Sequence, residues 1–193
     1  MAKPKRATSK PFDRWVHFIR EEAAPPVGKK LAKDDAAVAE VLALAKKNDP
    51  RVLAYFQALV DGNTSFSVFD FECYPEMLVR GRKGEAWNAG GKVMATDDVC
   101  LAKNGAGDLH VWNAKSGKVR FLVHDEGWKA TSTSGNIDDF IVDAMGSVVE
   151  LAGTDQLDDA DDAYLARLRF AISMAGDESL DDDVRERLAE LDE

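Results

Sequence analysis

The sequence contains few of the residues that build cross-linked, cysteine-rich metal-binding or membrane-embedded proteins. Its 193 residues include two cysteines, Cys73 and Cys100, which are too few for a disulfide framework or a cysteine-rich zinc site. The longest apolar stretches, such as VAEVLALA, are interrupted by charged residues and fall far short of the about 18 residues that span a bilayer. These absences favour a soluble protein, for which the reducing cytosol is the simplest compartment.

The start of the chain is basic but does not look like a secretory signal. The residues MAKPKRATSKPFDR are followed by the amphipathic WVHFIREE, whereas a signal peptide continues into an apolar core and a small-residue cleavage site. We interpret residues 1–11 as a disordered basic lead. The length of the chain then allows one folded domain at 12–150 and an acidic helical extension at 151–193, packed on that domain.

Negative charge is concentrated at the C-terminal end. The net charge is −10, and residues 151–193 contain 14 acidic residues against four arginines, so this segment accounts for all of it. An acidic surface repels nucleic acid and attracts a basic protein through long-range steering. We therefore expect a basic protein partner, with no nucleic acid and no membrane. A solvated helical face without any partner is the alternative that the composition leaves open.

The apolar periodicity changes twice along the chain and predicts helices, then a sheet, then helices. Helices are expected at 12–19, 35–47, 50–62, 136–148, 158–174 and from 179 onwards, and strands at 65–72, 76–80, 93–95, 99–102, 109–113 and 119–123. Short turns rich in glycine, asparagine and lysine separate the later strands and require antiparallel neighbours, and we read residues 131–135 as a linker. The prediction is an α+β fold, in which an antiparallel-rich mixed sheet packs against the N-terminal helices and acidic helices follow it.

Two of these strands suggest a binding face. In the segments 109–113 and 119–123, we assign Leu109 and Val111, together with Val119, Phe121 and Val123, to the core side. The opposite side would then be more apolar than a fully solvated face, so it is either covered by helices or binds a partner. The predicted partner-binding residues are His110, Trp112, Arg120 and Leu122, with Asp97 and Asp98 at the rim.

The central segment resembles a known family. The run MATDDVCLAKNGAGDLHVWNAKSGKVRFLVHDEG, followed by a helix at NIDDFIVDAM, is similar to the SUKH superfamily, as is the earlier DPRVLAYFQALVDGN. The resemblance covers about half of the chain, residues 49–145. The superfamily includes yeast Knr-type cell-wall regulators and many bacterial immunity proteins. The aspartate-rich terminal helices lie outside its pattern.

The resemblance implies a recognition scaffold without chemistry of its own. Bacterial relatives typically bind and neutralise a cognate toxin, often a nuclease, whose surface is basic. By this resemblance the protein would be a non-enzymatic cytoplasmic immunity protein of a bacterial polymorphic toxin system, without a cofactor, and a monomer or weak dimer. A regulatory adaptor of SUKH type without a toxin partner is the alternative.

Three chemical alternatives have weaker support in the residues. The glycine-rich Asn104–Asp108 loop precedes a strand, whereas a phosphate-binding loop precedes a helix, so we predict a hairpin turn. His17, His110 and His124 match no known metal-ligand spacing. The serines of the 131–135 segment lack the motif of a catalytic nucleophile. After an immunity protein and an adaptor, an enzyme is the third function to consider, and it would require a deep pocket with converging titratable groups.

Overall fold

The computed structural model describes residues 10–21, 36–62, 66–68, 71–73, 94–176, 178 and 180–191. Residues 1–9 of the predicted basic lead and the strand expected at 76–80 lie outside the described residues, whereas Pro11 already belongs to the first helix. The helices are α1 (Pro11–Glu21), α2 (Ala36–Asn48), α3 (Pro50–Gly62), α4 (Ile137–Glu150), α5 (Thr154–Asp158), α6 (Asp162–Ala175) and α7 (Asp182–Glu190). The strands are β1 (Phe66–Val68), β2 (Phe71–Cys73), β3 (Asp98–Lys103), β4 (Leu109–Asn113), β5 (Val119–Val123) and β6 (Lys129–Ser134).

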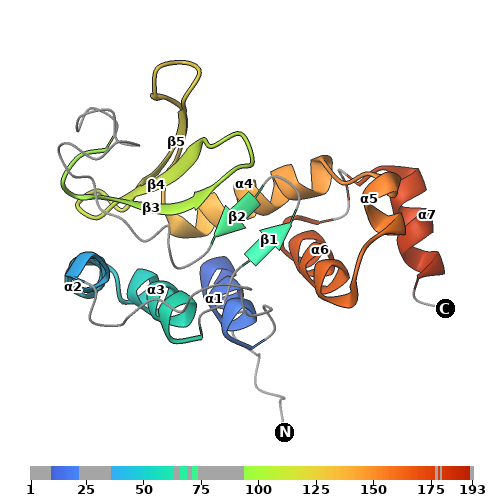
Figure 1. Ribbon diagram of the computed structural model, residues 1–193, viewed down its shortest axis with the longest axis horizontal. Helices are drawn as coiled ribbons and strands as arrows, with labels where there is room; N and C mark the ends of the chain where they lie inside the picture. The colour runs from blue at the N-terminus through green and yellow to red at the C-terminus, as the bar shows by residue number, and fades with distance from the viewer. Residues whose placement is uncertain are drawn as a thin grey trace, which may run out of the picture.

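The six strands form one antiparallel sheet in the order of the chain, β1 to β6. Short connections hold β3, β4, β5 and β6 antiparallel to one another, whereas the antiparallel pair of β2 with β3 is joined by the longer segment 74–97. Helices precede and follow the sheet in the sequence, so the predicted α+β fold is confirmed. Figure 1 shows α1, α2 and α3 together on one side of β3 to β5, with α5 and α7 at the far end of the molecule from α2.

Three expectations about the strands are wrong. Residues 65–72 do not form a single strand, because β1 and β2 pair with each other through Val68 and Phe71 and only residues 69 and 70 lie between them. Met94 and Ala95 are not in a strand but precede the turn before β3. Residues 131–134, read as linker, belong to β6, whose side chains are exposed except for the half-buried Ser134 and whose backbone pairs with β5. No apolar alternation marks such a strand.

The main core lies between the sheet and the helices and is rich in aromatic rings. Trp15 of α1 stacks on Tyr55 of α3 with 4.6 Å between ring centroids, and Phe18 stacks on Phe170 of α6 at 4.2 Å. The Tyr55 hydroxyl donates a 2.7 Å hydrogen bond to the backbone oxygen of Leu101 in β3, which joins α3 to the sheet. Such buried polar groups require a partner, so this bond also sets the position of α3.

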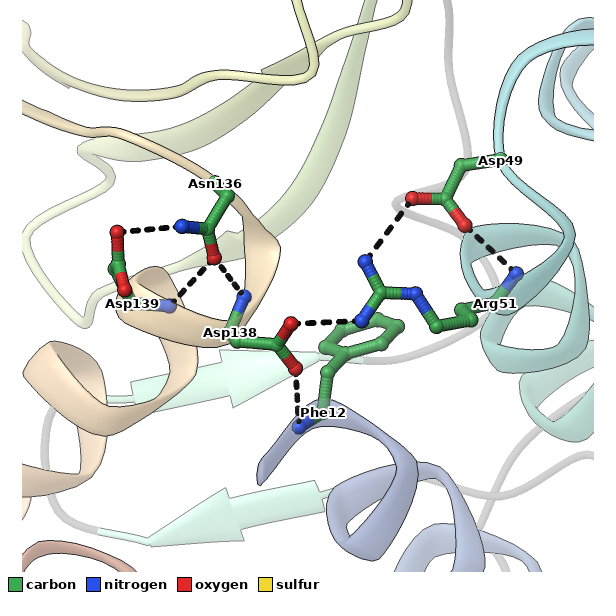
Figure 2. Close-up of polar contacts among 6 residues, drawn as sticks. All are labelled: Phe12, Asp49, Arg51, Asn136, Asp138 and Asp139. Atoms are coloured by element: carbon green, nitrogen blue, oxygen red, sulfur yellow. Dashed lines mark hydrogen bonds and ion pairs between the residues drawn. The ribbon is translucent and has the colours of Figure 1, made fainter. Parts of the chain in front are cut away.

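The N-terminus of α4 is tied to the N-termini of α1 and α3. Asn136 caps α4 by accepting hydrogen bonds from the backbone N–H groups of Asp138 and Asp139, as its sequence position predicts. The Asp138 carboxylate accepts a hydrogen bond from the backbone N–H of Phe12 at 3.1 Å and from Arg51 at 2.7 Å. Figure 2 shows how this one carboxylate joins the three helices, so the position of α4 is defined relative to both.

The C-terminal helices pack on the rest of the molecule through α6. This helix contacts α4 and β1, and α7 contacts α5. Asp161 caps α6 and Asp181 caps α7, so the two helices begin later than the sequence pattern predicted. Gly176 ends α6 with a φ of 95°. Among the residues that the structure describes, no helix is long and apolar enough to cross a bilayer.

Candidate partner-binding site

The six residues predicted to bind a partner do not form one surface. In the β4/β5 register, His110 pairs with Phe121 and Trp112 pairs with Val119. Leu122 pairs instead with Leu109, and Arg120 with Val111. Directly paired residues of antiparallel strands point to the same face. The prediction that His110, Trp112, Arg120 and Leu122 share a face is therefore wrong.

The error has a simple physical origin. Each strand has the expected bounds, but the alternation within one strand does not say how it is aligned with its neighbour, and a shift of one residue exchanges the two faces. Trp112 lies in the main core and Leu122 in a smaller cluster on the opposite face, and each is 1% exposed. Neither side chain is available for a partner in this structure.

The acidic pair at the start of β3 is used within the protein. The Asp98 carboxylate is fully buried and accepts hydrogen bonds from Arg120 at 2.5 Å, from Asn113 at 2.8 Å and from the backbone N–H of Ala95 at 2.7 Å. Asp97 forms an ion pair with the exposed Lys115 at 2.6 Å. Two predicted site residues, Asp98 and Arg120, are therefore brought together, but as a polar link between β3, β4 and β5.

His110 is the predicted residue that borders a cavity. A hollow of about 240 Å³ lies between β6 and α4, and its lining includes His110, Phe121, Ser132, Ser134, Phe140 and Asp143. Ser132 pairs with Phe121 and Ser134 pairs with Val119, so both serines lie on the face that α4 covers. The cavity thus has an aromatic floor and a polar wall.

The imidazole of His110 is held among aromatic rings. It stacks on Phe121 with 4.6 Å between centroids and lies 5.3 Å from Phe140 and 5.7 Å from Phe71. Burial lowers the pKa of His110 to about 4, although the negative charge of Asp108 acts in the opposite direction. At neutral pH the ring is uncharged and offers one N–H donor and one nitrogen acceptor.

The polar wall of the cavity carries a carboxylate at its outer edge. Asp143 of α4 is exposed and accepts a 3.0 Å hydrogen bond from the hydroxyl of Ser134 in β6. One turn further along α4, the hydroxyl of Ser147 donates to the backbone oxygen of Asp143 at 3.3 Å. Of the residues that the structure describes, Asp143 is the one acidic side chain that lines this cavity, and none of the lining residues is a lysine or arginine.

A second hollow continues from the first along the end of α4. Leu151, which is 56% exposed, lines both of them. The second hollow is bordered by β1, α5 and α6, and its lining includes Asp155, Asp159, Asp161, Tyr164 and Arg167. Burial lowers the pKa of Arg167, although Asp161 opposes this effect. Among the described residues that line it, three aspartates face one arginine.

The acidic residues of the C-terminal helices are on the surface. Eleven aspartates and glutamates between residues 155 and 190 are exposed: Asp155, Asp158, Asp159, Asp161, Asp162, Glu178, Asp181, Asp182, Asp183, Glu186 and Glu190. Few cations balance them. Arg185 pairs with Asp182, and Arg187 bridges Asp158 and Glu190. The end of the molecule formed by α5, α7 and the start of α6 is therefore an acidic surface (Figure 1).

His124 belongs to a separate polar cluster in the turns at the end of the sheet. Its Nδ1 lies 2.7 Å from Asp108, which also accepts the His124 backbone N–H at 2.8 Å and the Asn104 amide at 3.0 Å. The hydrogen bond with Asp108 is the main reason that the pKa of His124 is raised. Burial acts to raise the pKa of Asp108, but these hydrogen bonds outweigh it and lower the pKa. The glycine-rich Asn104–Asp108 segment is a hairpin turn, as predicted.

Two residues of the cavity, Ser134 and Asp143, were not predicted from the sequence. Ser134 follows no apolar alternation, and Asp143 looks like one more solvated acid on an amphipathic helix. Only the spacing Asn136–Asp139–Asp143, which marks the exposed side of α4, hinted at a polar edge. Among the described residues, no group of three histidines, cysteines or acids is arranged to hold a metal ion.

Comparison with known proteins adds no relative. No family model matches the chain, and neither the curated proteins nor the solved structures include a match.

Proposed function

We propose that this protein is a non-catalytic domain that binds a basic protein partner. The observation that carries the proposal is the acidic surface, because residues 151–193 account for the net negative charge and eleven of their acids are exposed on α5, α6, α7 and the turns beside them. A surface of one sign raises the rate of encounter with a partner of the opposite sign and disfavours partners of the same sign.

The resemblance to the SUKH superfamily makes this proposal more specific. On that resemblance, the protein acts in the bacterial cytoplasm as an immunity protein, and its partner is a basic toxin such as a nuclease. The antiparallel sheet backed by helices is compatible with a rigid recognition scaffold. A regulatory adaptor without a toxin partner would leave the acidic surface without a defined use, so we favour immunity.

The partner is tested genetically first. The gene next to that of this protein is expressed in a bacterium, and survival is measured with and without this protein. We expect the neighbouring product to be toxic and basic, and co-expression to restore growth. If no neighbouring product is toxic, the immunity proposal is wrong, and an adaptor becomes the better hypothesis.

The role of charge is tested on the purified pair. We choose three exposed acids whose carboxylates form no ion pair among the described contacts, and neutralise them together: Asp159→Asn, Asp183→Asn and Glu186→Gln. A control variant neutralises three exposed acids elsewhere: Asp13→Asn, Glu21→Gln and Glu126→Gln. Both variants have a net charge of −7 instead of −10.

The two variants should differ in the rate at which they associate with the partner. Charges at the edge of an interface act mainly on association, so at low salt we expect the first variant to bind about tenfold more slowly, with little change in dissociation. The association rate of the control variant should fall much less. Equal effects of both variants would show that only the overall charge matters, and the proposed surface would be wrong.

A further inference from the structure

We propose that an extended segment of a partner adds as a strand to β6 and places a lysine or arginine side chain in the cavity between β6 and α4. This inference rests on the proposed function in one respect, since it supposes a basic protein partner. It adds a binding site, a backbone geometry and a specific side chain.

The backbone of β6 is suited to strand addition. It is the last strand of the sheet, and no described strand pairs with its outer side. The three pairs next to the cavity are in regular register: Ser132 with Phe121, Thr133 with Arg120 and Ser134 with Val119. The strand contains no proline, and after Lys129 its side chains are small, so an incoming backbone can reach the N–H and C=O groups of residues 130–134.

The cavity beside this edge has the size of one side chain. Its volume of about 240 Å³ is below the about 300–1,000 Å³ typical of small-molecule sites. Alternate residues of an added strand point towards the face that α4 covers. One such side chain can therefore enter between Ser134 and α4 and reach the rings of His110 and Phe121.

The lining selects a cation. Among the described residues, Asp143 is the one acid at the cavity and no lysine or arginine lines it, so a positive group at the entrance gains a partner and a negative group is repelled. The rings of Phe121 and Phe140 pack against the methylene groups of a lysine or arginine, and an aromatic face attracts its charge. The uncharged His110 does not oppose it.

The surface beyond the cavity also favours basic residues. The exposed Leu151 connects the cavity to the hollow that contains Asp155, Asp159 and Asp161. A segment that leaves the cavity along the end of α4 therefore passes over an apolar contact and then over carboxylates. Further basic residues in that segment would be favoured, which links this site to the acidic surface.

The test uses a blocked heptapeptide, Thr-Val-Thr-Lys-Thr-Val-Thr, and the full-length protein. Two control peptides have norleucine or glutamate in the centre. Backbone amide NMR shifts locate binding, and their concentration dependence gives Kd. We expect the lysine peptide to shift β6 amides and the His110 ring with a Kd of about 1 mM, and the control peptides to bind at least about tenfold more weakly.

Two N-methylated versions of the lysine peptide test the strand geometry. One is methylated at odd positions and the other at even positions, and in an antiparallel pair only alternate residues face the neighbouring backbone. One version should lose binding and the other should keep it. If both bind as well as the parent peptide, strand addition is wrong.

A charge variant with a matched control tests the cation preference. Asp143→Asn should raise the Kd of the lysine peptide about threefold to fivefold, as expected for a partly exposed ion pair. Asp13→Asn on α1 should leave this Kd unchanged. Equal binding of the lysine and glutamate peptides, absence of binding, or pairing of β6 with a second copy of the chain would overturn the inference. NMR shifts confined to α5–α7 would show that the lysine does not bind in the cavity, but the proposed binding of a basic partner would still stand.

Discussion

Replacing Asp138 with alanine is expected to lower the free energy of unfolding by about 2 kcal/mol, because one carboxylate joins three helices (Figure 2). The substitution removes the acceptor of the Phe12 backbone N–H at the start of α1, which resembles the loss of a helix cap and costs about 1 kcal/mol. It also removes the 2.7 Å ion pair with Arg51. Since the two side chains are 20% and 28% exposed, we assign this pair about 1 kcal/mol.

Related substitutions separate these contributions. Asp138→Asn retains an oxygen that can accept from Phe12 but loses the charge, so it should cost about half as much as alanine. A double-mutant cycle with Arg51→Ala should give a coupling energy of about 1 kcal/mol, because Asp49 still pairs with Arg51 when Asp138 is absent. Glu150→Ala, an exposed substitution at the other end of α4, is the control and should change stability by less than about 0.5 kcal/mol.

The measurement is urea unfolding followed by far-UV circular dichroism and by tryptophan fluorescence. Coincident transitions with an unchanged m-value would justify a two-state comparison of the variants. If Asp138→Ala costs no more than Glu150→Ala, or if the cycle shows no coupling, the carboxylate does not stabilise the junction of α1, α3 and α4.

The remaining predictions concern the turns, α4 and the buried thiols. The pKa of His124 is raised above 6.5 by its hydrogen bond with Asp108. The stability that this contact gives the fold is therefore complete below pH 6.5 and is lost as the pH rises through the folded pKa. NMR titration of the His124 ring in Asp108→Asn should give a lower pKa. Gly127 has a φ of 70°, so Gly127→Ala should destabilise by about 1 kcal/mol, whereas Gly146→Ala in α4, with open space around the added methyl, should stabilise by up to about 1 kcal/mol; urea unfolding would show opposite signs. Burial raises the pKa of both cysteine thiols to about 12, so iodoacetamide should label them only after unfolding, and rapid labelling of the folded protein would contradict their burial.

Helices and strands with a strong local pattern could be predicted closely. The predicted helices at 50–62 and 136–148 begin within one residue of α3 and α4, because the cap interactions of Asp49 and Asn136 involve neighbours in the chain. The strands β4 and β5 have the predicted bounds, since apolar alternation and glycine turns mark both of them. β6 could not be found in this way, because its polar residues adopt a strand by pairing with β5.

By itself, the sequence determined the α+β layout, the starts of α3 and α4 and the acidic end of the chain, since these depend on composition and on interactions over a few residues. Only the tertiary structure decided the β4/β5 register, which separates Arg120 and Leu122 from His110 and Trp112. It also decided the site, because His110 of β4, Ser134 of β6 and Asp143 of α4 become neighbours through strand pairing and the packing of α4. Such contacts between distant segments are set by the whole core and are not encoded in any local pattern.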